Sequence, residues 1–471
     1  MNRLKIYLIS GLIIGLGLLI LYPGKQLARA HVNERTAVTD HPLLCTSCHV
    51  PISKNKLITK LINSDYYSPF NLAVDQHNRW LYVIAQDTDE LLVVDLETKV
   101  VTAKIKVGKH PHSVILDQDE HRAYVSNEWS DYISVIDLSL LEVVDTIPTG
   151  NGPAGIMLDQ DESYLYVVNA YGSDISVIEL VSKKEVRRLT AGNNPTGITI
   201  SPEGKEILVT GRRVNIAAYN ETLITELTLI DTQTQRAIKE NVESAYLMEN
   251  AAYTPEGDLA FVTLIRPKNQ IPSVQVEGGW MMTHGIGVLE RGQDANITQF
   301  LLDEPNAYYP DPFDIEITPD GKKAFVSSSG VDMISVIAID SIRTMLKQKN
   351  QKIRKTYANN LDLSRRFVIK RIKTGENPKG MTLSSDGKKL YVAEQLNDKI
   401  SLINTETLEK EASIDLGGPV GITVARQGRR LFNNAGHTFQ KQYSCYTCHP
   451  DNHEDGLIYN MAGKDMGCLL Y

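Results

Sequence analysis

Cysteine is scarce in this chain, and the signatures of several common enzyme classes are missing. The 471 residues include five cysteines and three tryptophans. We find no Gly-rich phosphate loop, no Gly-x-Ser-x-Gly elbow and no His-Glu-x-x-His zinc motif. The formal net charge is −8 and basic residues form no stripe, so nucleic acid is not an expected partner. These absences argue against a phosphate-loop enzyme, a serine hydrolase and a zinc peptidase.

Four of the five cysteines fall into two copies of one motif, Cys45–His49 near one end and Cys445–His449 near the other. Cys-x-x-Cys-His is the attachment signature of a c-type haem, whose vinyl groups bond the thiols and whose iron binds the imidazole. A zinc half-site would need two further ligands beside each pair, and a thioredoxin-like motif would need an adjoining βαβ pattern that we do not find. The sequence therefore predicts two covalently attached haem c groups, held by Cys45, Cys48, Cys445 and Cys448, with His49 and His449 as the near-side iron ligands.

Long apolar runs are also rare, and the one present stands at the N-terminus. Ile6–Tyr22 is uninterrupted, follows Arg3 and Lys5, and precedes the small-residue stretch Ala28–Ala30. We expect residues 1–30 to be a signal peptide, with an N-terminal membrane anchor through residues 6–22 as the alternative. Both versions imply export to the periplasm or an equivalent compartment. Only Cys468 remains outside the haem motifs, so no structural disulfide is expected within the chain.

A repeat fills the middle of the sequence. Tyr82, Tyr124, Tyr166 and Leu208 occupy equivalent positions 42 residues apart, each within a short apolar core and each between a turn and an alternating strand. Later copies are centred on Phe261, Phe325 and Tyr391. Four short strands in a period of about 42 residues are typical of β-propeller blades. We therefore predict a mainly β fold with seven blades and short haem segments at both ends.

The repeat also predicts the domain boundaries. We expect an N-terminal haem segment over residues 31–65, the propeller over 66–416, and a partial repeat leading into a haem domain over 417–471. Gly418–Thr423 copies Asn194–Thr199, so an eighth blade is the alternative to seven.

Extra length interrupts the repeat after its fourth copy, where the spacing rises to 53, 64 and 66 residues. Blade four carries an insert over Gly211–Thr225 and blade five a longer one over Arg266–Gly285, both between the second and third strands. In an antiparallel blade these connections share a face with the blade-to-blade loops, such as the one that holds His110. Ile342–Tyr357 in blade six reads as a helix between the third and fourth strands, and therefore on the opposite face.

Two resemblances follow from these motifs. The Tyr-Val cores with Gly-x-x-Pro openings, as in Gly108–Pro111 and Gly375–Pro378, resemble the YVTN family of bacterial β-propellers over residues 60–416. Arg426–Ala435 followed by Cys445–Pro450 resembles the start of a haem domain of the MauG and dihaem cytochrome c peroxidase type. That family would continue with a second haem motif, whereas this sequence ends at Tyr471, so the domain looks cut short.

The far-side iron ligands are not determined by the sequence. Local candidates are few, and a surface polar role is the alternative for each of them. The inserted loop of blade five offers aromatic, thioether and imidazole groups that could contact a haem or a partner, or only pack over the propeller rim. Arg212 and Arg213 in the insert of blade four could meet a haem propionate. The far-side candidates are His31, His41, His437, His453, Met461 and Met466, and the loop residues are Trp280, Met281, Met282 and His284.

Three functions fit these features, and no catalytic residue can be named for any of them. The first is an exported dihaem cytochrome whose propeller is a docking platform for a partner redox protein. The second is a subunit or fragment of a multihaem oxidoreductase, either peroxidase-like or similar to hydrazine synthase, which pairs a seven-bladed propeller with dihaem-peroxidase-like modules. The third is a partner-binding propeller with incidental haems.

Overall fold

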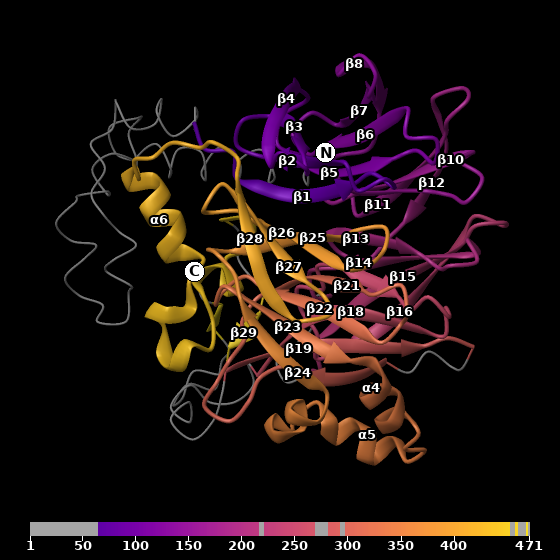
Figure 1. Ribbon diagram of the computed structural model, residues 1–471. Coiled ribbons are helices and arrows are strands. Elements are labelled where there is room, and N and C mark those ends of the chain that lie inside the picture. Colours follow the sequence, from indigo (N-terminus) through magenta and orange to yellow (C-terminus); the bar gives the residue numbers. More distant parts are fainter. Residues whose placement is uncertain are drawn as a thin grey trace, which may run out of the picture. The chain divides into compact units, whose positions relative to one another are not determined.

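Seven four-stranded antiparallel sheets follow one another along the chain in the computed structural model (Figure 1). The structure describes residues 65–215, 221–268, 281–292, 297–452, 457–459 and 468–469. The predictions for residues 1–64 therefore lie outside the described residues. Each sheet uses four consecutive strands, so the predicted seven-bladed β-propeller is confirmed.

The strands of blades one to three share one pattern of lengths, and blade four differs in its longer third and fourth strands. Blade one holds β1 (Pro69–Val74), β2 (Trp80–Ala85), β3 (Glu90–Asp95) and β4 (Val100–Lys106). Blade two holds β5 (Pro111–Leu116), β6 (Arg122–Asn127), β7 (Tyr132–Asp137) and β8 (Glu142–Pro148). Blade three holds β9 (Pro153–Leu158), β10 (Tyr164–Asn169), β11 (Asp174–Glu179) and β12 (Lys184–Thr190). Blade four holds β13 (Pro195–Ile200), β14 (Glu206–Gly211), β15 (Ile224–Asp231) and β16 (Arg236–Glu243).

Blade five carries longer strands and blade six an insertion, whereas blade seven has the strand lengths of blades one to three. Blade five holds β17 (Ala251–Tyr253), β18 (Leu259–Pro267), β19 (Met282–Glu290) and β20 (Ile297–Leu301). Blade six holds β21 (Pro312–Ile317), β22 (Lys323–Ser328), β23 (Met333–Ala338) and β24 (Val368–Lys373). Blade seven holds β25 (Pro378–Leu383), β26 (Lys389–Glu394), β27 (Lys399–Asn404) and β28 (Glu409–Asp415).

The apolar core of each repeat is buried on both faces of its sheet. In β2, Leu81 and Val83 pack against blade seven, while Tyr82 and Ile84 pack against blade two. Alternate side chains of a strand point to opposite faces, so a strand between two neighbouring blades needs an unbroken apolar run. One such cluster lies at every blade interface, including the interface between blades one and seven.

Backbone-to-side-chain hydrogen bonds repeat from blade to blade. In blades one, two, three, four and seven, the residue before the inner strand has a positive φ and donates its backbone N–H to a side chain just before the third strand of the preceding blade. His110 bonds Asp89 at 2.9 Å, and Asn377 bonds Asp332 at 2.8 Å. The same bond closes the ring between Ser68 and Asp398 at 2.8 Å. All four strands of blade one are consecutive in the sequence, so no strand from the C-terminal end of the propeller completes that sheet. The ring closes instead through these hydrogen bonds and through apolar packing between blades one and seven.

The segment expected to offer an eighth blade forms a helix instead. Gly418–Thr423 contains no strand, and α6 (Val424–Phe432) follows with the Thr423 side chain as its N-cap. The Tyr66 hydroxyl donates to the Gly421 carbonyl at 2.5 Å and accepts from the Thr423 N–H at 3.0 Å. These bonds direct the chain away from a strand register, so the eighth-blade alternative is wrong for the described residues. Short turns η3 (Ala435–His437), η4 (Phe439–Lys441), α7 (Cys445–Cys448) and η5 (Pro450–Asn452) come next, followed by the pair β29 (Ile458–Tyr459) and β30 (Cys468–Leu469).

The insertions lie where their lengths predicted, with one difference. In blade six, α4 (Ile339–Leu346), α5 (Gln351–Tyr357) and η2 (Leu361–Arg366) stand between β23 and β24. Helical structure is thus where it was predicted, but as two α-helices and not the single helix expected over Ile342–Tyr357. In blade five, Met282 pairs with Pro267 in an extension of the β18–β19 hairpin. The predicted loop over Arg266–Gly285 is therefore shorter than expected, because Met282 and His284 belong to a strand. No helix in the described part of the chain is long and apolar enough to cross a membrane.

Candidate haem-attachment site

The second Cys-x-x-Cys-His motif forms one turn of helix, α7, with a capped start. The Ser444 side chain accepts from the Thr447 N–H at 3.3 Å, and the Thr447 hydroxyl accepts from the Ser444 N–H at 2.9 Å. This reciprocal capping box begins the turn at Cys445. The His449 N–H then donates to the Cys445 carbonyl at 2.9 Å, which continues the turn to the predicted iron ligand.

Asp311 of blade six holds this turn against the propeller. Its two carboxylate oxygens accept the Ser444 hydroxyl and the Thr447 hydroxyl, both at 2.6 Å. Asp311 is 3% exposed, and burial raises the pKa of its carboxyl group, while the two hydroxyl donors act in the opposite direction. Each hydroxyl of the capping box therefore makes one hydrogen bond within the helical turn and one to blade six.

Tyr446 lies between the two cysteines and reaches the side chains at the centre of the propeller face. Its hydroxyl donates to Glu249 at 3.0 Å and accepts from Arg212 at 3.0 Å. Arg212 also pairs with Glu249 at 2.9 Å and with Asp451, so its guanidinium is occupied by protein carboxylates. Burial, followed by the nearby Glu249 charge, raises the pKa of Tyr446 and keeps the phenol protonated. The Lys379 ammonium lies 4.4 Å from the Tyr446 ring centre, and its pKa is lowered to about 8 by burial.

An aromatic cluster near Tyr446 crosses the propeller axis. Phe70 of blade one lies 5.4 Å from Phe313 of blade six and 4.9 Å from His112 of blade two, between ring centres. Blades one and six are not neighbours in the ring, so the contact between Phe70 and Phe313 spans the centre. Lys379 lies over Phe313 at 4.2 Å and joins this cluster to Tyr446. Burial lowers the pKa of His112 to about 4.

The predicted loop of blade five also contacts the segment that leads into α7. The His284 Nε2–H donates to the Gln442 carbonyl at 2.6 Å, and Nδ1 accepts from the Asp311 N–H at 3.3 Å. With both ring nitrogens bonded and its ring buried, His284 is positioned as a support for the turn and not as an iron ligand. Met281 donates its N–H to the Gln442 side chain at 2.9 Å, and Met282 is buried in a cluster that includes Tyr443 and Tyr446.

The residues present fit a covalently attached haem. Cys445 and Cys448 are three positions apart on one helical turn and therefore share a side of it, and both are half-buried. Ser444 and Thr447 instead face blade six, and Tyr446 faces the centre of the propeller. His449 is half-buried and directly follows the turn. Both cysteine side chains are partly exposed, and Cys448 also packs against the buried cluster that includes Met282 and Leu457.

Of the other predicted far-side ligands, only His437 lies among the described residues. His437 is exposed on η3, beside α6. Within the described ranges, no group of three or more His, Cys, Asp or Glu residues is arranged to hold a metal ion. The remaining predicted residues, Cys45, Cys48, His49, His31, His41, Trp280, His453, Met461 and Met466, lie outside the described residues.

Sequence reasoning missed the propeller residues that hold the turn. Glu249, Asp311 and Lys379 stand in blade-opening positions where other blades carry different residues, so no local pattern distinguishes them. Gln442 lies two residues before Ser444 and gave no signal of its own. Their common property is proximity to α7, which only the fold shows.

Comparisons with known proteins agree with this architecture. The family model of the YNCE-like beta-propeller matches residues 103–204. Hydrazine synthase subunit beta of Kuenenia stuttgartiensis is 26% identical over 208 residues, which are 44% of this chain and 52% of that relative. The match thus spans about half the length of the relative. A solved structure of Kuenenia stuttgartiensis hydrazine synthase gives a TM-score of 0.69 at 24% identity, over 76% of this chain and 99% of the other. The chain is a seven-bladed propeller similar to that subunit, whereas the haem and MauG-like features stay predictions.

Proposed function

We propose that this protein is an exported dihaem c-type cytochrome whose propeller holds a haem in a fixed position for electron transfer with a partner redox protein. The observation that carries the proposal is the preformed Cys445–His449 turn, held by side chains from blades four, five and six. Electron transfer requires little movement of the donor and acceptor sites, and a rigid propeller face meets that requirement.

Each residue of the site has a separate part. The thiols of Cys445 and Cys448 bind the haem vinyl groups, and His449 ligates the iron, with Cys45, Cys48 and His49 doing the same at the other motif. When bound, the haem iron supplies a one-electron couple. Tyr446 and Asp311 fix the orientation of the turn, and Met282 and His284 exclude water from its inner side.

The partners we propose are a redox protein or the other subunits of a multihaem complex. Similarity to a protein named as a subunit of hydrazine synthase supports the second version. In that version the chain is a propeller subunit of a multihaem oxidoreductase, and its site supplies or removes electrons for chemistry on another subunit. Export to the periplasm, with residues 6–22 as signal or anchor, provides the compartment in which haem attachment occurs.

Mass measurement of the mature full chain tests the proposal. We expect the mass of two haems above that of the polypeptide, and one haem in Cys445→Ser/Cys448→Ser. The variant Cys468→Ser is the matched control and should keep both. A wild-type protein without added haem would overturn the proposal. Low-spin spectra at both irons would support electron transfer, and a five-coordinate iron that reacts with peroxide would support an enzyme instead.

A further inference from the structure

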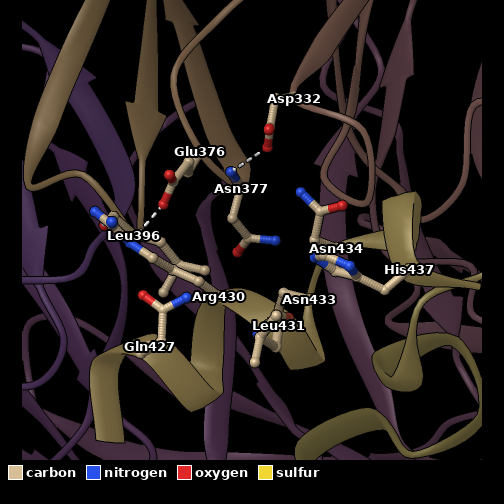
Figure 2. Close-up of a pocket in the computed structure, with 10 residues that line it drawn as sticks. All are labelled: Asp332, Glu376, Asn377, Leu396, Gln427, Arg430, Leu431, Asn433, Asn434 and His437. Atoms are coloured by element: carbon tan, nitrogen blue, oxygen red, sulfur yellow. Dashed lines mark hydrogen bonds and ion pairs between the residues drawn. The ribbon is translucent and has the colours of Figure 1, made fainter. Parts of the chain in front are cut away.

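A pocket lies between α6 and the loops of blades six and seven (Figure 2). It contains about 500 Å³ of empty space open to solvent. Polar side chains form most of its lining, and Figure 2 shows Asn377 among them, with Asp332, Asn434 and His437 around it. The pocket is separate from the turn that carries Cys445 and Cys448.

One buried acceptor in this pocket has no partner. Asn377 is 2% exposed, and its amide Nδ2 donates to the Ser329 carbonyl at 3.1 Å, which fixes the orientation of the amide. Its Oδ1 has no hydrogen-bond partner among the described residues. A buried acceptor left without a donor destabilises the folded state, so a native structure normally satisfies it.

The equivalent residue of another blade shows which kind of donor bonds an amide oxygen at the position of Asn377. Asn194 is the equivalent residue of blade four, and its Nδ2 likewise donates to the preceding blade, at the Ala170 carbonyl, 3.2 Å away. Its Oδ1, however, accepts from the guanidinium of Arg212 at 3.3 Å. Blade seven has Gln395 at the position equivalent to Arg212, and the Gln395 amide bonds Gln86 instead. The same amide therefore has a guanidinium donor in blade four and lacks one in blade seven.

The charges of the pocket favour a cation there. Glu376 is already paired with Arg430 at 2.6 Å. Asp332 is half-buried, and only one of its oxygens accepts a hydrogen bond from the described residues, the N–H of Asn377. Asp332 and Asn377 line the same pocket, and a carboxylate oxygen and an amide oxygen are both acceptors for the several N–H groups of one guanidinium.

We propose that this pocket binds a guanidinium group, with the Asn377 amide oxygen and the Asp332 carboxylate as its acceptors. The group belongs either to a small molecule or to an arginine side chain of a partner protein, since both present the same donors. This site goes beyond the proposed electron-transfer function and does not depend on haem.

Calorimetric titration of the full chain tests the site with two probes, methylguanidinium and the tripeptide Gly-Arg-Gly. We expect saturable one-to-one binding. Asp332→Asn keeps an oxygen for the Asn377 N–H but turns a neutral amide toward the ligand, so affinity should fall roughly tenfold or more. Asp131→Asn is the matched control, because Asp131 accepts from the Gly152 N–H in the same way at 2.9 Å but does not line the pocket.

The outcomes separate the two sources of the ligand. Tighter binding of the tripeptide supports an arginine side chain of a partner, and equal or tighter binding of methylguanidinium supports a small molecule. No saturable binding of either probe to wild type would overturn the proposal. Equal losses in Asp332→Asn and Asp131→Asn would do the same, since they would show a general effect on the blades. Thermal unfolding of both variants should match wild type, which excludes misfolding as the cause.

Discussion

The hydroxyl of Tyr446 donates to the Glu249 carboxylate at 3.0 Å, across 197 positions of sequence. A residue inside the Cys-x-x-Cys-His motif is thereby bonded to the residue two positions before the inner strand of blade five. The variable position between the two cysteines thus serves to hold the motif on the propeller.

Replacing Tyr446 by phenylalanine should destabilise this contact. Tyr446→Phe keeps the ring against Lys379 but removes the bonds to Glu249 and Arg212, so we expect a loss of about 1 to 2 kcal/mol in the free energy of unfolding. Denaturant unfolding measures it. Tyr171→Phe removes a bond to Glu128 from a more exposed hydroxyl and should cost less. Equal losses would contradict the role given to Tyr446.

Asp311 should control whether the turn stays docked. Asp311→Ala removes both hydroxyl acceptors and should increase protease cleavage between residues 438 and 452, with a loss of about 1 to 3 kcal/mol. Ser444→Ala and Thr447→Ala each remove one of the two bonds and should give intermediate cleavage rates. If either single variant equalled Asp311→Ala, the shared role of the two hydroxyls would be wrong.

Acid should weaken the protein through His112. Burial lowers the pKa of this imidazole from an unfolded value of about 6.5 to about 4, so the folded state favours the neutral ring. Its contribution to stability is complete above pH 6.5 or so and is lost as the pH falls from there to about 4. Melting temperatures measured across this range should fall less steeply in His112→Leu than in wild type. His121→Gln, at an exposed position, should follow wild type; a parallel fall in all three proteins would refute the assignment.

Arg426 should be required for a stable closed ring. It is 2% exposed and bonds Ser68 of blade one at 2.7 Å, and the Gln395 carbonyl and Asp398 of blade seven at 2.7 and 3.0 Å. Arg426→Met leaves the buried Asp398 carboxylate without its cation and should cost about 3 kcal/mol or more in unfolding experiments. Adding Asp398→Asn removes that charge but keeps an acceptor for the Ser68 N–H, so the double variant should recover part of the loss. A double variant no more stable than the single one would show that the charge is unimportant.

The propeller could be predicted from the sequence because its signal is repeated. The apolar runs around Tyr82 and its equivalents are buried on both faces, so every blade carries the same local pattern. Contacts between distant segments had no such signal. Thr423 was expected to lie in a repeat, yet its side chain caps a helix, and the nearby bonds to Tyr66 come from the other end of the propeller. His284 was expected in a loop. It lies in a strand because Pro267 pairs with Met282 and extends the hairpin, and this pairing leaves no pattern in the sequence.

The Cys-x-x-Cys-His motif can be read from the sequence, but its structural surroundings could not. Cys445, Cys448 and His449 form a local pattern that needs no tertiary information. Asp311 and Glu249 come from different blades and meet this turn only because the ring closes. A single sequence does not show which of many acidic residues on loops share one face.

Closure without an exchanged strand has a consequence for how the chain folds as it is made. Each blade uses four consecutive strands, so blades can form one after another as the polypeptide is synthesised. The apolar side of blade one that includes Leu81 and Val83 must wait for blade seven, and Arg426 follows only after that. Until then the incomplete ring exposes an apolar sheet face, so the chain is most prone to aggregation before blade seven has formed.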